Sequence, residues 1–307
     1  MTKIIFIHKG QSWFLPYVLN QAELYAPGDV VLLADNAHKN VLCTIEKLHN
    51  IESEYIDSFK KVYFHMSTNN HAHEEFCWVR WFYLLEYMKK TQMSSVLYFD
   101  SDVLIYSSII DMLSTYSLHD YDCGFCIPEQ EYSEMKWVAS GHISYWSIKG
   151  LERFCKFILE SFQEPEQMKQ YKEKWKWHKI NHEPGGICDM TTLYLFWYNK
   201  RAKIANLLEI NQNKTVDDNV NVPGNLYDNE YEFSKNHKKI RITQGIFFIK
   251  RTIDEKLIQF LAIHFQGSGK KLIPRYYTGN IKLPNKAPIE LRKLLITYSK
   301  KLVQRLL

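Results

Sequence analysis

The stretch Val96-Leu97-Tyr98-Phe99-Asp100-Ser101-Asp102-Val103-Leu104-Ile105-Tyr106 decides how the rest of the sequence is interpreted. Its first four residues are apolar and end in two aromatics, which predicts a buried strand. Two carboxylates follow where that strand should end. An unpaired charge is very costly in a core, so we expect Asp100 and Asp102 at the carboxyl end of the strand, facing the ligand crevice of an open α/β sheet. Such oxygen donors suit Mg²⁺ or Mn²⁺. The alternative is a turn between two strands with solvated carboxylates.

The residues before this stretch predict a parallel sheet. Lys3–His8 and Val30–Ala34 have the pattern of buried strands, with a helix over Ser12–Tyr25 between them. This order is a βαβ unit with a right-handed crossover. His8 and Asp35 stand at the ends of these two strands and should lie beside the crevice. For Asp35, a helix cap is the alternative.

The rest of the chain continues the α/β pattern. Apolar positions at helical spacing predict a helix over His73–Lys90, with Arg80 on its largely apolar face. A Gly-Gly turn leads to Asp189 at the start of another helix, where an N-cap is the simplest role for its carboxylate. Further strands are predicted at 61–65, 122–127, 137–147 and 240–249, further helices at 109–116 and 151–162, a surface helix or loop at 165–183, and an irregular loop at 211–236.

Composition and charge limit the classes of protein and partner. The 307 residues suffice for one large domain or two smaller ones, and the net charge is +5. Most of the basic excess lies between Lys270 and Arg305, which favours anionic partners: phosphates, a membrane surface or, least of the three because no motif supports it, nucleic acid. The six cysteines are scattered, as expected of free thiols in a reducing cytosol. Cys123-x-x-Cys126 could be half a zinc site, but no second pair follows.

The two ends of the chain bear on its location. The first residues have no signal-peptide pattern, and no apolar run approaches the roughly 20 residues that span a bilayer. Residues 288–307 form a basic amphipathic pattern, which fits an interfacial membrane helix or a helix packed on the domain. We therefore expect a cytoplasmic protein. If residues 288–307 form an interfacial helix, the protein would also bind the cytosolic face of an anionic membrane.

A second polar motif lies near the end of the predicted domain. His264-Phe265-Gln266-Gly267-Ser268-Gly269-Lys270 follows a short apolar strand end. Glycine-rich backbone followed by a lysine can cradle phosphate groups, although the spacing is not that of a P-loop. Two carboxylates and an imidazole from distant parts of the chain, Asp100, Asp102 and His264, suit one Mn²⁺.

These motifs together carry a resemblance to a known family. The Asp-x-Asp between apolar strands resembles the metal and sugar-nucleotide motif of GT-A fold glycosyltransferases. The segment from His264 to Lys270 resembles the His-x-Gly-x-x-Lys motif of glycosyltransferase family eight, with one residue more between His264 and Gly267. The resemblance covers most of residues 1–270. It implies a GT-A-type domain over 1–287, a Rossmann-like mixed sheet flanked by helices, with a nucleotide-binding half (1–106), an acceptor half (107–287) and a basic helical extension (288–307).

The resemblance also implies roles on the donor side. Asp100, Asp102 and His264 would hold Mn²⁺ or Mg²⁺, with Asp102 counted among the catalytic residues. Arg80 would reach the donor and the motif carboxylates, although it could instead snorkel or pair within the fold. Lys270 and Gly267 would neutralise and cradle the diphosphate, and His8 and Asp35 would contact the nucleotide.

Further roles fall on the sugar side. Asp189 would face the acceptor and serve as general base in an inverting enzyme. Ser140, Gly141 and His142 would contact the donor sugar, with a satisfied core histidine as the alternative for His142. Trp177, His178 and His182 would offer the acceptor a stacking platform, or else anchor their segment to the core.

The sequence thus predicts a metal-dependent glycosyltransferase that moves a sugar from a UDP- or GDP-type nucleotide sugar to a saccharide or lipid-linked acceptor in surface glycan synthesis. One alternative is a catalytically inactive carbohydrate-binding module on the same fold. The other is a phosphatase of the haloacid dehalogenase type, whose Asp-x-Asp usually lies near the N-terminus with Thr or Val where Leu104 stands here.

Overall fold

The computed structural model describes residues 2–279, so the helix expected at 288–307 lies outside the described residues. Within this range a mixed sheet of seven strands runs through the molecule in the order β3-β2-β1-β4-β7-β6-β8. The strands are β1 (Lys3–His8), β2 (Val30–Ala34), β3 (Thr44–Lys47), β4 (Ser95–Phe99), β6 (Cys123–Cys126), β7 (Ser140–Ser147) and β8 (Ile204–Asn206).

The first half of this sheet is parallel. β1 pairs in parallel with both β2 and β4, and β3 pairs in parallel with β2, as the βαβ pattern predicted. β7 runs antiparallel to β4 and to β6, which makes the sheet mixed. The predicted α/β fold, a mixed sheet flanked by helices, is confirmed.

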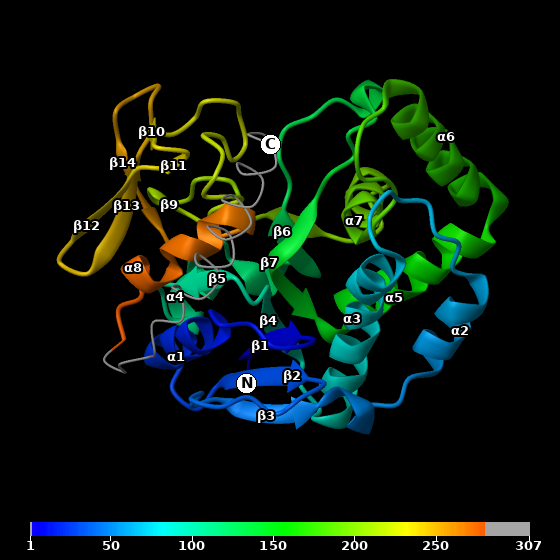
Figure 1. Cartoon of the computed structure of the whole chain (residues 1–307), viewed down its shortest axis with the longest axis horizontal. Helices are drawn as coiled ribbons and strands as arrows, with labels where there is room; N and C mark the ends of the chain where they lie inside the picture. The colour runs from blue at the N-terminus through cyan, green and yellow to red at the C-terminus, as the bar shows by residue number, and fades with distance from the viewer. Residues whose placement is uncertain (1, 280–307) are drawn as a thin grey trace, which may run out of the picture.

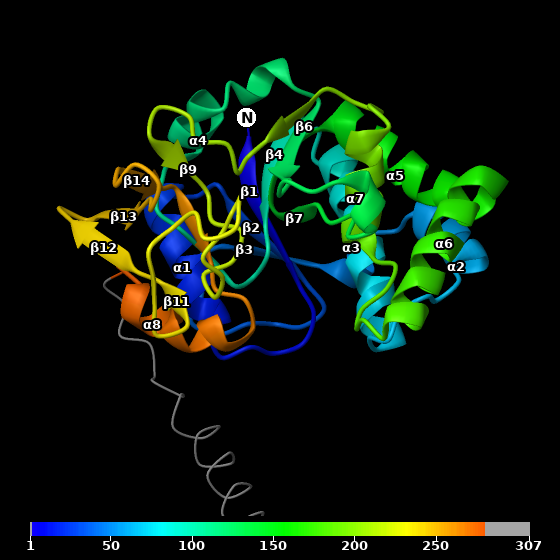
Figure 2. The same cartoon turned by 90° about the horizontal axis from the view of Figure 1, so that it is seen from above.

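Helices cover both faces of the sheet (Figures 1 and 2). One face carries α2, α3, α5, α6 and α7, and the other carries α1, α4 and α8 together with a small second sheet. The helices are α1 (Leu15–Tyr25), α2 (Glu54–Val62), α3 (His71–Lys90), α4 (Ile109–Thr115), α5 (Ile148–Gln163), α6 (Pro165–Asn181), α7 (Asp189–Tyr198) and α8 (Ile273–Tyr276). None of the helices within residues 2–279 is both long and apolar enough to cross a membrane.

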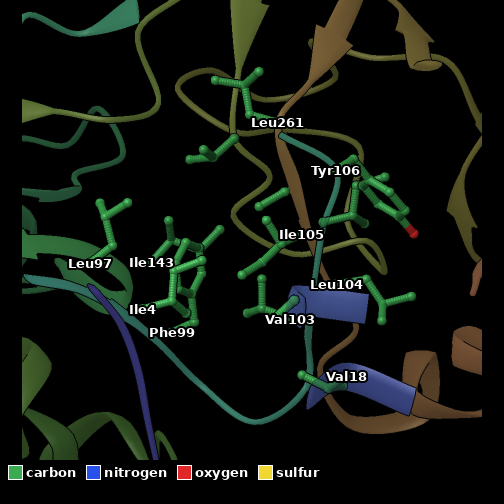
Figure 3. Packing of buried hydrophobic residues seen from close by; sticks show 14 of the residues in the cluster. Ile4, Val18, Leu97, Phe99, Val103, Leu104, Ile105, Tyr106, Ile143 and Leu261 are labelled. Carbon is green, nitrogen blue, oxygen red and sulfur yellow. The ribbon is translucent and has the colours of Figure 1, made fainter. Parts of the chain in front are cut away.

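The core has two parts because strand side chains alternate between the faces. In β4, Leu97 and Phe99 belong to one buried cluster, whereas Val96 and Tyr98 belong to the other. Figure 3 shows the first cluster, with residues of the main sheet packed beside those of the strand that follows the Asp-x-Asp turn. This continuous packing holds the carboxyl end of β4 between two rigid layers.

The strand after the turn leaves the main sheet. β5 (Val103–Ile105) pairs antiparallel with β15 (Ala262–His264), and Val103 lies opposite His264. This pairing brings two motifs that are more than 150 residues apart in the sequence to one place. The remaining strands form two small sheets: β9 (Lys214–Thr215), β12 (Ile240–Thr243), β13 (Ile246–Lys250) and β14 (Leu257–Phe260) in one, and β10 (Phe233–Ser234) with β11 (His237–Lys238) in the other.

Two expectations about local structure are wrong. The strand expected at 61–65 does not form, because α2 continues to Val62 and the chain then leaves it as a loop. No helix begins near Asp35, since the next element after β2 is the strand β3, so the side chain is not a helix cap. The carboxylate instead accepts a hydrogen bond from the Gly10 N–H at 2.9 Å.

Candidate active site

The Asp-x-Asp turn is held by backbone hydrogen bonds on both sides. The Asp100 N–H donates to the carbonyl of His142 at 2.8 Å, which ties the turn to β7. The carbonyl of Asp102 accepts from the Phe265 N–H at 2.9 Å, which ties it to the segment after β15. The two carboxylates are therefore fixed at the carboxyl end of β4, as the sequence predicted.

Arg80 of α3 joins two acidic residues from different elements. Its guanidinium donates from Nη1 to Asp100 Oδ1 and from Nη2 to Asp189 Oδ2, each at 2.7 Å. Tyr98 OH also donates to Asp100 Oδ1 at 2.7 Å. Burial opposes the charge of Arg80, but the nearby carboxylates outweigh it and hold its pKa well above the ordinary value. Arg80 is thus paired within the fold, while it also lines the cavity described below.

Asp102 forms a second cluster with His264 and Lys270. Its Oδ1 lies 3.3 Å from His264 Nε2, and its Oδ2 lies 2.9 Å from Lys270 Nζ. Burial opposes ionisation of Asp102, but the two basic groups outweigh it and hold its pKa well below the ordinary value. Burial also opposes the charge of His264, yet Asp102 raises the pKa of this imidazole to about 9.

The orientation of His264 is set by residues that the sequence did not single out. Its Nδ1 lies 2.6 Å from the carbonyl of Asp218, which can only accept, so Nδ1 carries a proton. Nε2 faces Asp102 and is also protonated at pH 7, since the pKa of the ring is about 9. The His264 N–H donates to Asp217 Oδ2 at 3.2 Å. Asp217 in turn pairs with Lys238 at 2.6 Å, and both side chains are fully buried.

The oxygen and nitrogen atoms of Asp100, Asp102 and His264 are chemically suited to bind a hard divalent cation. Their arrangement in the structure meets this need only in part. Asp102 and His264 already face each other through the atoms that would bind it. Asp100 is turned toward Arg80 and Tyr98, and within residues 2–279 the three side chains do not form a group whose ligand atoms all lie within 4.8 Å. Asp100, Asp102 and His264 could therefore hold the metal once Asp100 shares its carboxylate between Arg80 and the ion.

A cavity of about 630 Å³ lies directly against this cluster. Arg80, Asp100, Asp102, Lys270 and His8 all line it, and His8 Nδ1 lies 2.8 Å from the hydroxyl of Ser101 inside the motif. Burial, followed by the neighbouring His38, lowers the pKa of His8 to about 4, so its ring is neutral at pH 7. Lys9 and Phe76 line this cavity as well as a neighbouring one of about 300 Å³ that contains Asp35.

A third cavity has a volume of about 660 Å³. Trp177 and His178 of α6 line it, together with Asp218, whose carbonyl accepts from His264. His182 lies beyond the end of α6 in a left-handed conformation (φ 54°), and it is not among the residues that line this cavity.

The remaining candidates on the sugar side lie deeper. Ser140, Gly141 and His142 of β7 line none of these three cavities. His142 is buried, with Nδ1 2.7 Å from Ser140 Oγ, and its ring stacks on His264 with centroids 4.2 Å apart. At Gly141 a Cβ would lie 2.5 Å from the Trp81 ring, so the glycine permits close packing of β7 against α3. Their role in sugar binding stays a prediction.

Asp189 is placed differently from the expected helix cap. Cys188 is the N-cap of α7, and Asp189 is the first helical residue. Its buried carboxylate accepts from Arg80 and from Trp81 Nε1 at 3.0 Å. These contacts tie the start of α7 to α3 and favour a positioning role for Asp189. The general-base role stays a prediction.

At Gly267 the backbone adopts φ 53°, which favours glycine, and the turn places Lys270 in the 3₁₀ segment Gly267–Leu272.

Sequence patterns missed five contributors to the site: Tyr98, Trp81, Asp217, Asp218 and Lys238. The pair Asp217-Asp218 lies in a segment expected to be an irregular loop, where the only signal was two adjacent acids.

No family model matches the sequence, and no curated protein matches it. Three solved structures resemble the fold at low identity. Mouse xyloside xylosyltransferase 1 is 8% identical over 71% of this chain and 87% of that one, with a TM-score of 0.47. The galactosyltransferase LgtC with donor and acceptor sugar analogues is 12% identical over 92% and 98%, also with 0.47. The bifunctional glycosyltransferase WbbM is 10% identical over 95% and 51%, with 0.46. All three are glycosyltransferases by name.

Proposed function

We propose that the chain is a metal-dependent glycosyltransferase that takes a UDP- or GDP-type nucleotide sugar as donor and a saccharide or lipid-linked acceptor. The observation that carries the proposal is the cluster of Asp102, His264 and Lys270 beside a cavity of about 630 Å³ at the carboxyl end of β4. Ligands of open α/β sheets bind at this end.

The donor side has two compartments that suit the two parts of a nucleotide sugar. The cavity at Asp102 also contains Lys270 and Arg80, whose positive charges suit phosphate groups. The neighbouring cavity of about 300 Å³ shares Lys9 and Phe76 with it and contains Asp35, a suitable acceptor for a ribose or base. We assign the diphosphate to the first compartment and the nucleoside to the second.

The cation would be held by Asp100, Asp102 and His264, and it would supply Lewis-acid stabilisation of the charge on the diphosphate leaving group. Lys270 would add a second positive charge at the same oxygens. Arg80 would hold Asp100 and Asp189 in position through its two hydrogen bonds. The acceptor would enter through the cavity of about 660 Å³, whose wall at Asp218 contacts His264.

The test is release of nucleoside diphosphate from a panel of UDP- and GDP-hexoses, with mono- and disaccharide acceptors and Mn²⁺. We expect one donor to be consumed and its sugar to appear on an acceptor. Asp102→Asn should lower the rate by about 10²-fold or more. The matched control is Asp111→Asn, whose carboxylate pairs with Lys214 at 2.6 Å outside the site.

An Asp102→Asn variant as active as the unaltered protein would contradict the mechanism. Saturable binding of a sugar nucleotide without any turnover would instead favour the carbohydrate-binding module. Phosphate release from simple phosphomonoesters, abolished by Asp100→Asn, would favour the phosphatase.

A further inference from the structure

Three side chains meet beside His264, whose ring stacks on that of His142. They are Cys126 at the end of β6, His142 in β7 and Asp218 in the loop after β9. Within residues 2–279 they form the one group of three or more His, Cys, Asp or Glu side chains whose ligand atoms all lie within 4.8 Å of one another. Three separate segments of the chain therefore converge on one point.

We propose that Cys126, His142 and Asp218 bind a thiophilic divalent cation of the zinc class. A thiolate, an imidazole and a carboxylate with a fourth position open are the ligand types of three-residue zinc sites. The sulfur is a soft donor that disfavours Mg²⁺ and Mn²⁺. This site differs in chemistry from the cluster of Asp102 and His264, and it does not depend on the proposed transferase activity.

The sequence pattern Cys123-x-x-Cys126 is not the site itself. Residues three apart in a strand point to opposite faces, and Cys123 belongs to the core cluster on the other side of the sheet. Cys126 lies instead beside His142 on the neighbouring strand, with Sγ 3.8 Å from Nε2. Cys123 and Cys126 therefore do not act as a pair, and the proposed site crosses two strands instead.

The separation of the two donor atoms matches tetrahedral coordination. Bond lengths near 2.3 Å to sulfur and 2.0–2.1 Å to nitrogen put the two atoms about 3.6 Å apart in a tetrahedral zinc site. The observed 3.8 Å requires a shift of only a few tenths of an ångström. The pairing of β6 with β7 holds these two donor atoms near each other, and the Asp218 carboxylate lies within 4.8 Å of both.

The ring of His142 can take the tautomer that binding requires. Without metal, Nε2–H can donate to the carbonyl of Asp217 at 3.1 Å. With metal on Nε2, the proton moves to Nδ1, where Ser140 Oγ accepts at 2.7 Å.

The thiol must lose its proton on binding. Burial, reinforced by the nearby Asp218 and Asp217, holds the pKa of Cys126 well above its ordinary value, so the metal-free residue is a thiol. Each cation bound displaces one proton to the solvent, with no change of oxidation state. Asp218 is half-buried and lines the cavity of about 660 Å³, which gives the ion a path to the site.

The test is titration of the metal-free, reduced protein with Co²⁺, followed by absorption spectroscopy. We expect a thiolate-to-Co²⁺ charge-transfer band with tetrahedral d–d bands at one equivalent. One equivalent of Zn²⁺ should remove them, and a large excess of Mn²⁺ should not. Cys126→Ser should abolish the charge-transfer band, and Asp218→Asn should weaken binding at least tenfold.

Cys77 provides the matched control. Its sulfur also lies 3.8 Å from a histidine Nε2, that of His73. Among residues 2–279, however, no third His, Cys, Asp or Glu side chain completes a group with this pair within 4.8 Å. Cys77→Ser should therefore keep the full cobalt spectrum. Because Cys126 is buried, circular dichroism must show that Cys126→Ser is folded, and the half-buried Asp218→Asn variant tests the site independently. No charge-transfer band in the folded protein, or loss of the band in Cys77→Ser rather than Cys126→Ser, would overturn the proposal.

Discussion

At the residue scale, the pair Asp217 and Lys238 shows how the fold supports the candidate site from behind. Lys238 Nζ donates to Asp217 Oδ1, to Asn225 Oδ1 at 2.8 Å and to the carbonyl of Asn219 at 3.0 Å. Burial raises the pKa of Asp217, against the attraction of Lys238. The other oxygen of Asp217 accepts from the His264 N–H. The pair thus fixes the residue that faces Asp102.

We predict that Lys238→Met lowers the free energy of unfolding by about 3–5 kcal/mol, because it leaves the Asp217 carboxylate buried without its cation. The double substitution Lys238→Met with Asp217→Asn should recover part of that loss. Chemical denaturation measures both.

The adjacent lysine is the control for this cycle. Lys239 pairs with Glu232 at 2.9 Å, but its side chain is 51% exposed. Lys239→Met should change stability by less than about 1 kcal/mol. Equal effects of the two lysine substitutions would mean that the buried pair does not support the site as described.

At the element scale, α6 is attached to its surroundings by a buried lysine. Lys174 donates to the carbonyls of Lys136 and Trp137, at 2.6 and 3.3 Å, and to Thr191 Oγ1 of α7 at 2.8 Å. Burial lowers the pKa of Lys174 to about 8. These contacts place Trp177 and His178 of α6 on the cavity wall.

The low pKa of Lys174 predicts how stability depends on pH. Between pH 8 and about 10.4 the unfolded chain holds a proton on this lysine that the folded chain has lost, so stability rises with pH across this window. The difference in free energy of unfolding between the unaltered protein and Lys174→Met should therefore shift in favour of the unaltered protein by about 3 kcal/mol from pH 7 to pH 10.5. Urea denaturation at several pH values measures it. The control is Lys176→Met, because Lys176 is exposed on the same helix. A flat difference for Lys174→Met, or an equal slope for Lys176→Met, would refute the assignment.

The loop that leads into α7 depends on a glycine. Gly186 adopts φ 152°, and a Cβ there would lie 2.2 Å from the carbonyl oxygen of Met66. The next residue, Ile187, donates its N–H to that same carbonyl at 2.7 Å. The close approach fixes where α7 and Asp189 begin.

We predict that Gly186→Ala destabilises the protein by about 3 kcal/mol or more, because backbone strain adds to a clash with fixed backbone. Gly245→Ala is the control, since Gly245 (φ 78°) has no atom within 4 Å of an added Cβ. Its effect should be about 1–2 kcal/mol, from the left-handed conformation alone. Thermal unfolding of the two variants gives the comparison, and equal losses would show that Met66 moves freely aside.

The elements with strong periodicity could be predicted from sequence, whereas short or polar ones could not. The run before Asp100 and the helical spacing around Arg80 gave β4 and α3 within two residues. The strand β3, with the sequence Thr-Ile-Glu-Lys, is half exposed and lacks a clear pattern. The strand predicted at 61–65 does not form, because a few apolar residues at the end of a helix have the same pattern as a short strand.

At the scale of the whole molecule, the site depends on pairings that local patterns do not contain. Residue types alone suggested that Asp102 and His264 meet, and the antiparallel pairing of β5 with β15 brings them together. The support of His264 by Asp217 and Asp218 requires the loop after β9 to pass beside β15, which no periodicity predicts. The orientation of Asp100 toward Arg80 is likewise a result of three-dimensional packing.

The proposed function assigns the three cavities to a donor in two parts and a separate acceptor. The measurement that tests this most directly is thermal unfolding with UDP and GDP, each with and without Mn²⁺, on the unaltered protein and on Asp102→Asn. A ligand at 100 times its dissociation constant that binds only the folded state stabilises it by about 2.7 kcal/mol. We predict that one nucleotide together with Mn²⁺ gives this shift, and that Asp102→Asn loses it. An equal shift in the folded Asp102→Asn variant, or no shift with either nucleotide in the presence of Mn²⁺, would contradict a metal-dependent donor site at Asp102.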